Sequence, residues 1–132
     1  MKEFSLSRRE KIKSRRELDL LFTKGKILYS KKNRFKTVLY LLEDSEKTGV
    51  KVVFAVHKKA GNAVWRNRVK RLMRESYRLN KKILSEHIGN RLLLLSFSPS
   101  RISQRNFRKI KLQDVTPEII DLLNQVKLKI SE

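Results

Sequence analysis

The chain has 132 residues, of which 39% are hydrophobic, and this suits one compact domain with a modest core. Its 33 Lys and Arg against 13 Asp and Glu give a formal net charge of +20, which favours a phosphate-rich partner. The absence of cysteine excludes disulfides, thiolate metal sites and cysteine nucleophiles. The longest apolar run, at 92–95, is too short to cross a bilayer, and the N-terminus lacks the apolar core of a secretory signal. We therefore expect a soluble, cytoplasmic protein without a membrane partner.

The N-terminal part is predicted to be a basic arm over residues 1–13, followed by a short helix. Ser14 and Glu17 have the spacing of a capping box, in which each side chain bonds a main-chain amide near the other residue. Gly25 follows the apolar positions of this segment and is a natural stop. The first helix is therefore predicted over Arg15–Lys24.

Three strands are predicted next. Residues 27–29 form a short apolar run, whereas 35–42 and 51–57 are longer and rich in β-formers. A short polar segment at 43–49 joins the two longer runs, and this arrangement predicts an antiparallel hairpin.

A long basic helix is predicted over residues 62–84, with Asn62 as its N-cap. One stripe of this helix is apolar and consists of Trp65, Val69, Leu72, Met73, Ser76 and Ile83. The opposite side gathers Asn67, Lys70, Arg71, Arg74, Arg78 and Lys81, with Arg66 and Arg68 on the flanks. The pattern predicts one face that packs on the protein and one that faces phosphates.

The C-terminal third contains a predicted buried strand at 92–97, a basic irregular stretch at 98–115 and a last helix. Thr116, Pro117 and Glu118 have the character of an N-cap, a first-turn proline and a first-turn acid, so this helix is predicted to begin there. The whole order predicts an α/β fold of the α+β type, a single domain over 1–132. We expect a mixed sheet of about four strands packed with three helices.

Little in the chain is suited to catalysis. A metal nuclease needs clustered carboxylates or histidines, but the acids are scattered in the sequence. His57 and His87 are far apart, and a hydrogen-bonded or solvated histidine is the more frequent case than a general base. The glycines are isolated and form no phosphate loop. We therefore predict no catalytic residue and no metal site in the protein itself.

Nucleic-acid binding fits the charge better. A charge run is usually only a solvated helix face, but here arginines, which suit phosphates and base edges, are concentrated on one helix. Charge alone does not choose between RNA and DNA. Among the aromatic residues, Phe54 is predicted to lie in the core, whereas Phe22 and Tyr40 fit either the core or a surface that stacks on unpaired bases.

One segment carries a specific pattern, KKAGNA at 58–63 followed by RNRVKR at 66–71 and by Arg74. This pattern closely resembles the signature of the bacterial ribonuclease P protein component. The likeness continues upstream at Leu6, Arg8, Phe22 and Gly25. It therefore covers most of residues 6–98.

The resemblance implies an α/β sandwich with an unusual left-handed βαβ crossover, a hand that the usual preference would not predict. Members of the family bind a large catalytic RNA, and the ribonucleoprotein cleaves precursor tRNA to form the mature 5′ end. The RNA, with magnesium, carries out the hydrolysis, so the protein alone is expected to be inactive. The implied partners are the catalytic RNA and precursor tRNA, and not DNA.

The resemblance also assigns residues. The RNA contacts on the second helix are Arg66, Asn67, Arg68, Lys70, Arg71 and Arg74. Lys58 and Lys59 flank that helix, and the basic arm adds Arg8 and Arg9 as RNA contacts. Phe22 and Tyr40 line a cleft for the single-stranded 5′ leader, although Leu18 stands where an aromatic is common in the family.

Two alternatives use the same charge. A structural RNA-binding protein of ribosomal type would show no preference for a leader. A DNA-binding regulator would place the second helix in a major groove, but this needs a preceding helix and turn, and here a strand precedes it.

Overall fold

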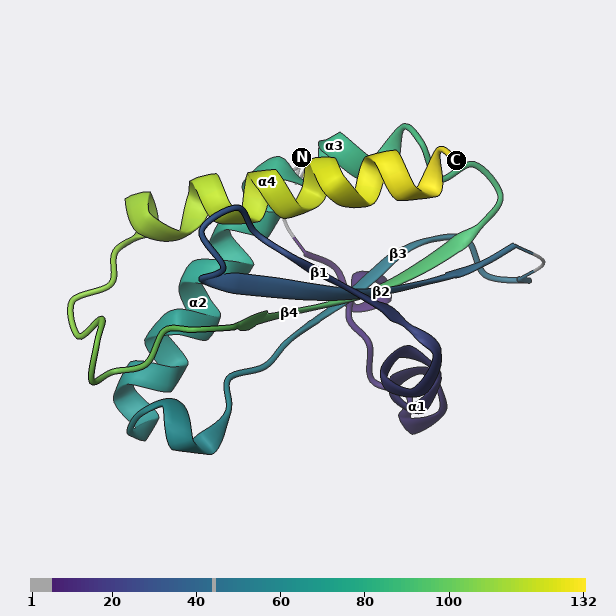
Figure 1. Ribbon diagram of the computed structural model, residues 1–132. Helices are drawn as coiled ribbons and strands as arrows, with labels where there is room; N and C mark the ends of the chain where they lie inside the picture. The colour runs from purple at the N-terminus through teal and green to yellow at the C-terminus, as the bar shows by residue number, and fades with distance from the viewer. Residues whose placement is uncertain (1–5, 44) are drawn as a thin grey trace.

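The computed structural model describes residues 6–43 and 45–132, so residues 1–5 of the predicted arm lie outside the described part. Four strands form one mixed sheet: β1 (Lys26–Tyr29), β2 (Phe35–Leu42), β3 (Gly49–Phe54) and β4 (Leu92–Pro99). The helices are α1 (Arg15–Lys24), α2 (Ala63–Asn80), α3 (Lys82–Ser85) and α4 (Leu112–Ile130), with short 3₁₀ turns η1 (Arg8–Glu10) and η2 (Lys58–Ala60). In Figure 1, α1 covers one face of the sheet and α4 lies over the other. The predicted α+β class is confirmed.

The predicted hairpin between 35–42 and 51–57 is wrong. The strand order is β1-β2-β4-β3, so β4 separates β2 from β3, and the antiparallel hairpin joins β1 to β2. β4 pairs antiparallel with β2 and parallel with β3. Its residues 92–95 are apolar and buried on both faces, which favours the centre of a sheet rather than an edge. A crossover through α2 and α3 therefore joins β3 to β4, and its left hand stays a prediction of the resemblance.

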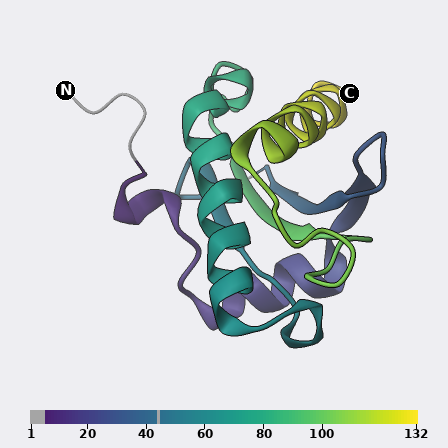
Figure 2. The ribbon, with the colours of Figure 1, turned by 90° about the vertical axis from the view of Figure 1, so that its left-hand side faces the viewer.

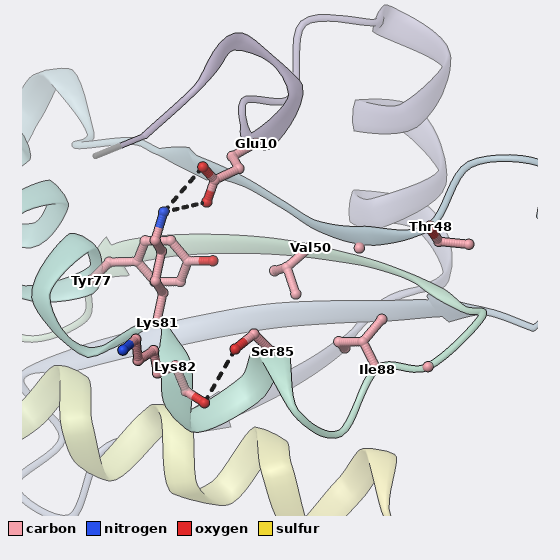
Figure 3. Close-up of a pocket in the computed structure, with 10 residues that line it drawn as sticks. Glu10, Thr48, Val50, Tyr77, Lys81, Lys82, Ser85 and Ile88 are labelled. Atoms are coloured by element: carbon pink, nitrogen blue, oxygen red, sulfur yellow. Dashed lines mark hydrogen bonds and ion pairs between the residues drawn. The ribbon is translucent and has the colours of Figure 1, made fainter. Parts of the chain in front are cut away.

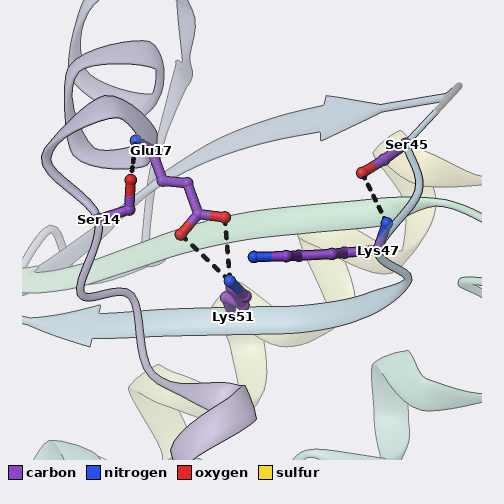
Figure 4. Close-up of polar contacts among 5 residues, drawn as sticks. All are labelled: Ser14, Glu17, Ser45, Lys47 and Lys51. Carbon is purple, nitrogen blue, oxygen red and sulfur yellow. Dashed lines mark hydrogen bonds and ion pairs between the residues drawn. The ribbon is translucent and has the colours of Figure 1, made fainter.

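The limits predicted for α1 are confirmed, but only half of its capping box forms. The Ser14 hydroxyl accepts a hydrogen bond from the Glu17 main-chain N at 3.3 Å. The Glu17 carboxylate instead pairs with Lys51 Nζ on β3 at 3.0 Å, as Figure 4 shows. Gly25 ends the helix in extended backbone, and its lack of a side chain lets the main chain lie close to β2. A Cβ there would lie 2.5 Å from Val38 Cγ1 on β2.

The predicted helix over 62–84 is divided in two. Asn62 caps α2 as predicted, with its Oδ1 accepting from the Trp65 main-chain N at 2.9 Å. At the other end, Asn80 Nδ2 donates to the Ser76 carbonyl at 2.8 Å and competes with the main chain for this acceptor. α2 therefore ends at Asn80, and the short α3 that follows buries Leu84 rather than Ile83.

The last helix begins five residues earlier than predicted, since its N-cap is Lys111 and not Thr116. The Lys111 main-chain N donates to Asp114 Oδ2 at 2.9 Å, so Asp114 supplies the first-turn acid. Pro117 consequently lies inside α4, and Glu118 is a buried residue that accepts a hydrogen bond from the Ser30 hydroxyl at 2.5 Å.

The sheet separates two apolar clusters. The larger one lies between the sheet and the layer of α2 and α4, and the smaller one, which contains Leu21 of α1, lies on the other face. Phe54 packs against the larger cluster, with its ring 5.9 Å from those of Tyr77 and Phe97, as predicted. Tyr77 was absent from the predicted apolar stripe, and its burial raises its pKa above the ordinary value of 10.0. Within the described residues, no helix is long and apolar enough to cross a membrane.

Candidate nucleic-acid interface

The first half of α2, residues 63–74, has the two faces that its sequence predicts. Trp65, Val69 and Met73 are buried against the core. The opposite side of the helix faces solvent, because the spacing of 3.6 residues per turn directs its polar residues away from the sheet. A shallow hollow of about 580 Å³ on that side is lined by Val64, Asn67, Arg68, Lys70, Arg71 and Arg74.

The cations of this half-helix have no acidic partner among the described residues. Arg66 Nε donates to the Gly61 carbonyl at 3.0 Å, and Arg68 Nε donates to the Ile110 carbonyl at 2.9 Å, so both partners are uncharged. The Arg74 guanidinium lies 5.9 Å from the centre of the Phe54 ring. Among the described residues, no carboxylate lies within ion-pair distance of the five cations between residues 63 and 74. Their charge is therefore available to an external polyanion.

Arg78 and Lys81, which the sequence places on the same side of the helix, differ from these five cations because each is paired with an acid. Arg78 forms an ion pair with Glu75, whose pKa is lowered by the hydrogen bond from Arg78. Lys81 Nζ lies 2.8 Å from Glu10 Oε2. The charge of both cations is therefore balanced by an acid of the same protein.

The described part of the basic arm packs along the edge of the sheet. Ile12 N donates to the Val52 carbonyl of β3 at 3.1 Å, and the Glu10–Lys81 ion pair joins the arm to the end of α2 (Figure 3). Arg8 and Arg9 are exposed and line a hollow of about 510 Å³ together with Lys47, Thr48 and Lys51. They therefore lie at the outer edge of β3, in a different hollow from the one on α2.

Two basic residues of the arm that were not predicted as contacts adjoin the α2 face. Lys11 and Lys13 line a hollow of about 230 Å³ together with Arg74. Their alternation with the buried Ile12 is a strand-like signal that could have identified them in the sequence. They connect the charged face of α2 to the arm.

Lys58 and Lys59 lie in η2, immediately before α2, so they flank the helix as predicted, and both are exposed. His57 Nδ1 accepts a hydrogen bond from the Lys59 main-chain N at 3.1 Å, so this histidine caps the turn. The hydrogen-bonded interpretation of His57 is confirmed.

The predicted cleft residues lie in the α1 layer. Phe22, on α1, has an exposed fraction of 56%, whereas Tyr40 is half-buried and packs against the smaller apolar cluster on the face of the sheet that α1 covers. Both residues therefore lie on the side of the sheet that α1 covers, and Phe22 is the more exposed of the two. Within residues 6–43 and 45–132, no three His, Asp or Glu side chains gather closely enough to hold a metal ion.

A family model described as Ribonuclease P matches residues 6–127 of this chain. The chain belongs to the ribonuclease P protein family. A ribonuclease P protein component from Dictyoglomus thermophilum is 33% identical over 108 residues, which cover 82% of this chain and 84% of that relative. Members of this family are protein components of a ribonucleoprotein endoribonuclease that processes tRNA.

Solved structures agree with the fold of this chain. The ribonuclease P protein from Thermotoga maritima superposes with a TM-score of 0.69 at 24% identity, over 88% of this chain and 96% of that one. The protein from Staphylococcus aureus gives a TM-score of 0.60 at 20% identity, over 93% of each chain. At these identities the likeness shows that the four-stranded mixed sheet with its helices is the fold of the family.

Proposed function

We propose that the protein binds the catalytic RNA of ribonuclease P through the first half of α2. Family membership supports a ribonucleoprotein role. The single observation that carries the assignment to α2 is its run of five cations, none of which lies within ion-pair distance of a carboxylate in the described part of the chain. Asn67 adds hydrogen bonds to the RNA. The contact with the RNA is extended by four further cations, Lys58, Lys59, Arg8 and Arg9. Arginine supplies forked donors that match phosphate oxygens, and each neutralised phosphate releases a counterion.

In this proposal the RNA carries the chemistry. Hydrolysis of a phosphodiester by the protein would require clustered acids or histidines, and the described residues offer no such group for magnesium. Magnesium is then held mainly by RNA, and the protein alone is inactive. A small protein of charge +20 lowers the repulsion between two large polyanions, the catalytic RNA and precursor tRNA, in the cytoplasm.

The α1 face is proposed to hold the single-stranded 5′ leader. Phe22 is a large aromatic residue with more than half of its surface exposed, which suits stacking on a base of any identity. Tyr40, half-buried on the face of the sheet that α1 covers, is the second residue of the proposed cleft. Binding of the leader would increase affinity for precursor tRNA over the mature product.

Reconstitution tests this function directly. We expect no cleavage by the purified protein alone, and removal of the 5′ leader at low magnesium when a bacterial ribonuclease P RNA is added. Cleavage by the protein without RNA would contradict the division of labour. In the presence of that RNA, we expect tighter binding of precursor than of mature tRNA, and equal binding would favour a structural RNA-binding role instead.

The leader site has a matched control on the opposite layer. Phe22→Ala should reduce the preference for precursor over mature tRNA and leave binding of the catalytic RNA unchanged. Leu128→Ala removes an exposed apolar side chain from α4, on the other face of the sheet, and should change neither. Equal effects of the two variants would contradict the proposed cleft.

A further inference from the structure

The connection between β4 and α4, residues 100–111, is a second basic element. We call this segment the connection loop. It contains no acidic residue. Five exposed cations lie along it: Arg101, Arg105, Arg108, Lys109 and Lys111.

Apolar side chains hold the connection loop on the protein. Ile102 and Ile110 are buried in the larger apolar cluster, and Phe107 packs against the same cluster. The Arg34 guanidinium lies 5.2 Å from the centre of the Phe107 ring. Because these anchors alternate with the exposed cations, the loop presents its charge from a packed backbone.

The connection loop is also bonded to the start of α2. The Gln104 side-chain oxygen accepts from the Asn62 main-chain N at 2.8 Å, and Gln104 N donates to the Ala60 carbonyl at 2.7 Å. Trp65 Nε1 donates to the Phe107 carbonyl at 3.0 Å. Gly61 permits this approach, since a Cβ there would lie 2.8 Å from Gln104 Cβ.

A further bond links the loop to the charged face itself. Arg68 Nε donates to the Ile110 carbonyl at 2.9 Å, which orients its guanidinium beside the loop. Figure 2 shows the loop next to the N-terminal half of α2, on the same side of the molecule. The two elements therefore form one continuous basic surface.

We propose that the connection loop is a second contact with the catalytic RNA, binding phosphates beside those bound by α2. This inference rests on the proposed function of α2. A packed loop loses less conformational entropy on binding than a free one, so its cations add affinity at low cost. RNA is favoured as the ligand because the loop continues the α2 surface and carries no acid that would suit a basic partner.

Two pairs of lysines test this proposal. Lys109→Ala/Lys111→Ala removes two exposed cations from the loop. Lys127→Ala/Lys129→Ala removes two half-buried cations from the other end of α4, about 24 Å along the helix from Lys111. Binding of the whole protein to a bacterial ribonuclease P RNA transcript is measured from low to high salt. The loop pair should weaken binding at 0.15 M salt by roughly 5- to 25-fold and reduce the salt slope by about one to two ions. The control pair should change neither.

The outcomes distinguish RNA binding by the connection loop from RNA binding by α2. If both pairs act equally, only net charge matters, and if the loop pair has no effect, the loop does not touch the RNA. Either result overturns the inference and leaves the proposed function of α2 in place. Failure of the unmodified protein to bind the transcript would overturn the proposed function first.

Crosslinking gives an independent measurement, because the chain has no cysteine of its own. A photoreactive group attached through Arg105→Cys should crosslink to the transcript near the nucleotides reached from Asn67→Cys. The same group attached through Lys127→Cys should not. Thermal unfolding of each labelled protein checks that it is folded, and absence of crosslinks from a folded Arg105→Cys protein would refute the contact.

Discussion

The two halves of α2 have cations in common but use them differently. Between residues 63 and 74 the helix carries five cations and no acid. Within the described part of the chain, Arg66 and Arg68 donate hydrogen bonds to main-chain carbonyls and pair with no carboxylate. From Glu75 onward, Arg78 is paired with Glu75, and Lys81, just past the helix end, is paired with Glu10. The first half is available to a partner, whereas the second half stabilises the protein.

This difference shows that formal charge and available charge are separate quantities. The net charge of +20 counts every cation equally, but a cation already paired with an internal acid neutralises a phosphate less readily and so releases fewer counterions from the RNA. One carboxylate within a turn of helix, or one brought close by folding, changes the role of an arginine or a lysine. The following variants test the contrast between the halves.

The largest effect is expected in the first half. Lys70→Ala/Arg71→Ala/Arg74→Ala should weaken binding to the catalytic RNA by roughly two orders of magnitude at 0.15 M salt, because three phosphate contacts are lost. The salt slope should fall by about two to three ions. Each single replacement should reduce the salt slope by about one ion or less. The single variants are Arg66→Ala, Arg68→Ala, Lys70→Ala and Arg74→Ala. Filter binding across a salt series measures both quantities.

The matched control for this experiment lies one turn further along the helix. Arg78→Ala removes the same side chain as Arg74→Ala, but from a residue whose charge is already paired with Glu75. We expect a smaller change in salt slope for Arg78→Ala than for Arg74→Ala. Equal salt slopes for Arg78→Ala and Arg74→Ala would contradict the proposed difference between the two halves of α2. Salt slopes that stay unchanged in all the first-half variants would contradict it as well.

A moderate effect is expected where the second half meets the arm. Glu10→Gln removes the charge that pairs with Lys81, and both side chains are mostly buried, so the free energy of unfolding should fall by about 1 kcal/mol. Trypsin should cleave the arm at Arg8 and Arg9 sooner, because the ion pair holds it against β3. Urea unfolding and timed proteolysis check these expectations. RNA salt dependence should change less than in the first-half variants, and a larger change would contradict the assignment.

The smallest effect is expected at the partly exposed Glu75–Arg78 pair. The hydrogen bond from Arg78 lowers the pKa of Glu75 below its ordinary 4.5, so the folded state favours the charged carboxylate. Its contribution to stability is present above pH 4.5 and is lost as the pH falls through the lowered pKa. Unfolding temperatures measured from pH 7 to pH 3 should therefore converge for the unmodified protein and Glu75→Gln. A difference that grows at low pH would reverse the sign.

Local signals in the chain were sufficient for several features. The Ser14 and Asn62 caps, the span of α1 and the buried stripe that begins at Trp65 follow from side chains a few residues apart, and helical periodicity and capping act over that range. Helical periodicity also predicted that the cations of α2 lie opposite its buried stripe. The signature at 58–74 was specific enough to indicate the family that the model match then established.

Contacts between distant segments were beyond such signals. β4 inserts between β2 and β3 because its buried leucines need cover on both faces, which no pattern within 35–57 reveals. Glu17 bonds Lys51 rather than its own helix end, and Lys81 bonds Glu10, 71 residues away in sequence. The connection loop joins α2 through hydrogen bonds across 42 residues. Folding alone selects such partners, since a charge or an amide bonds whichever group the chain brings within about 3 Å.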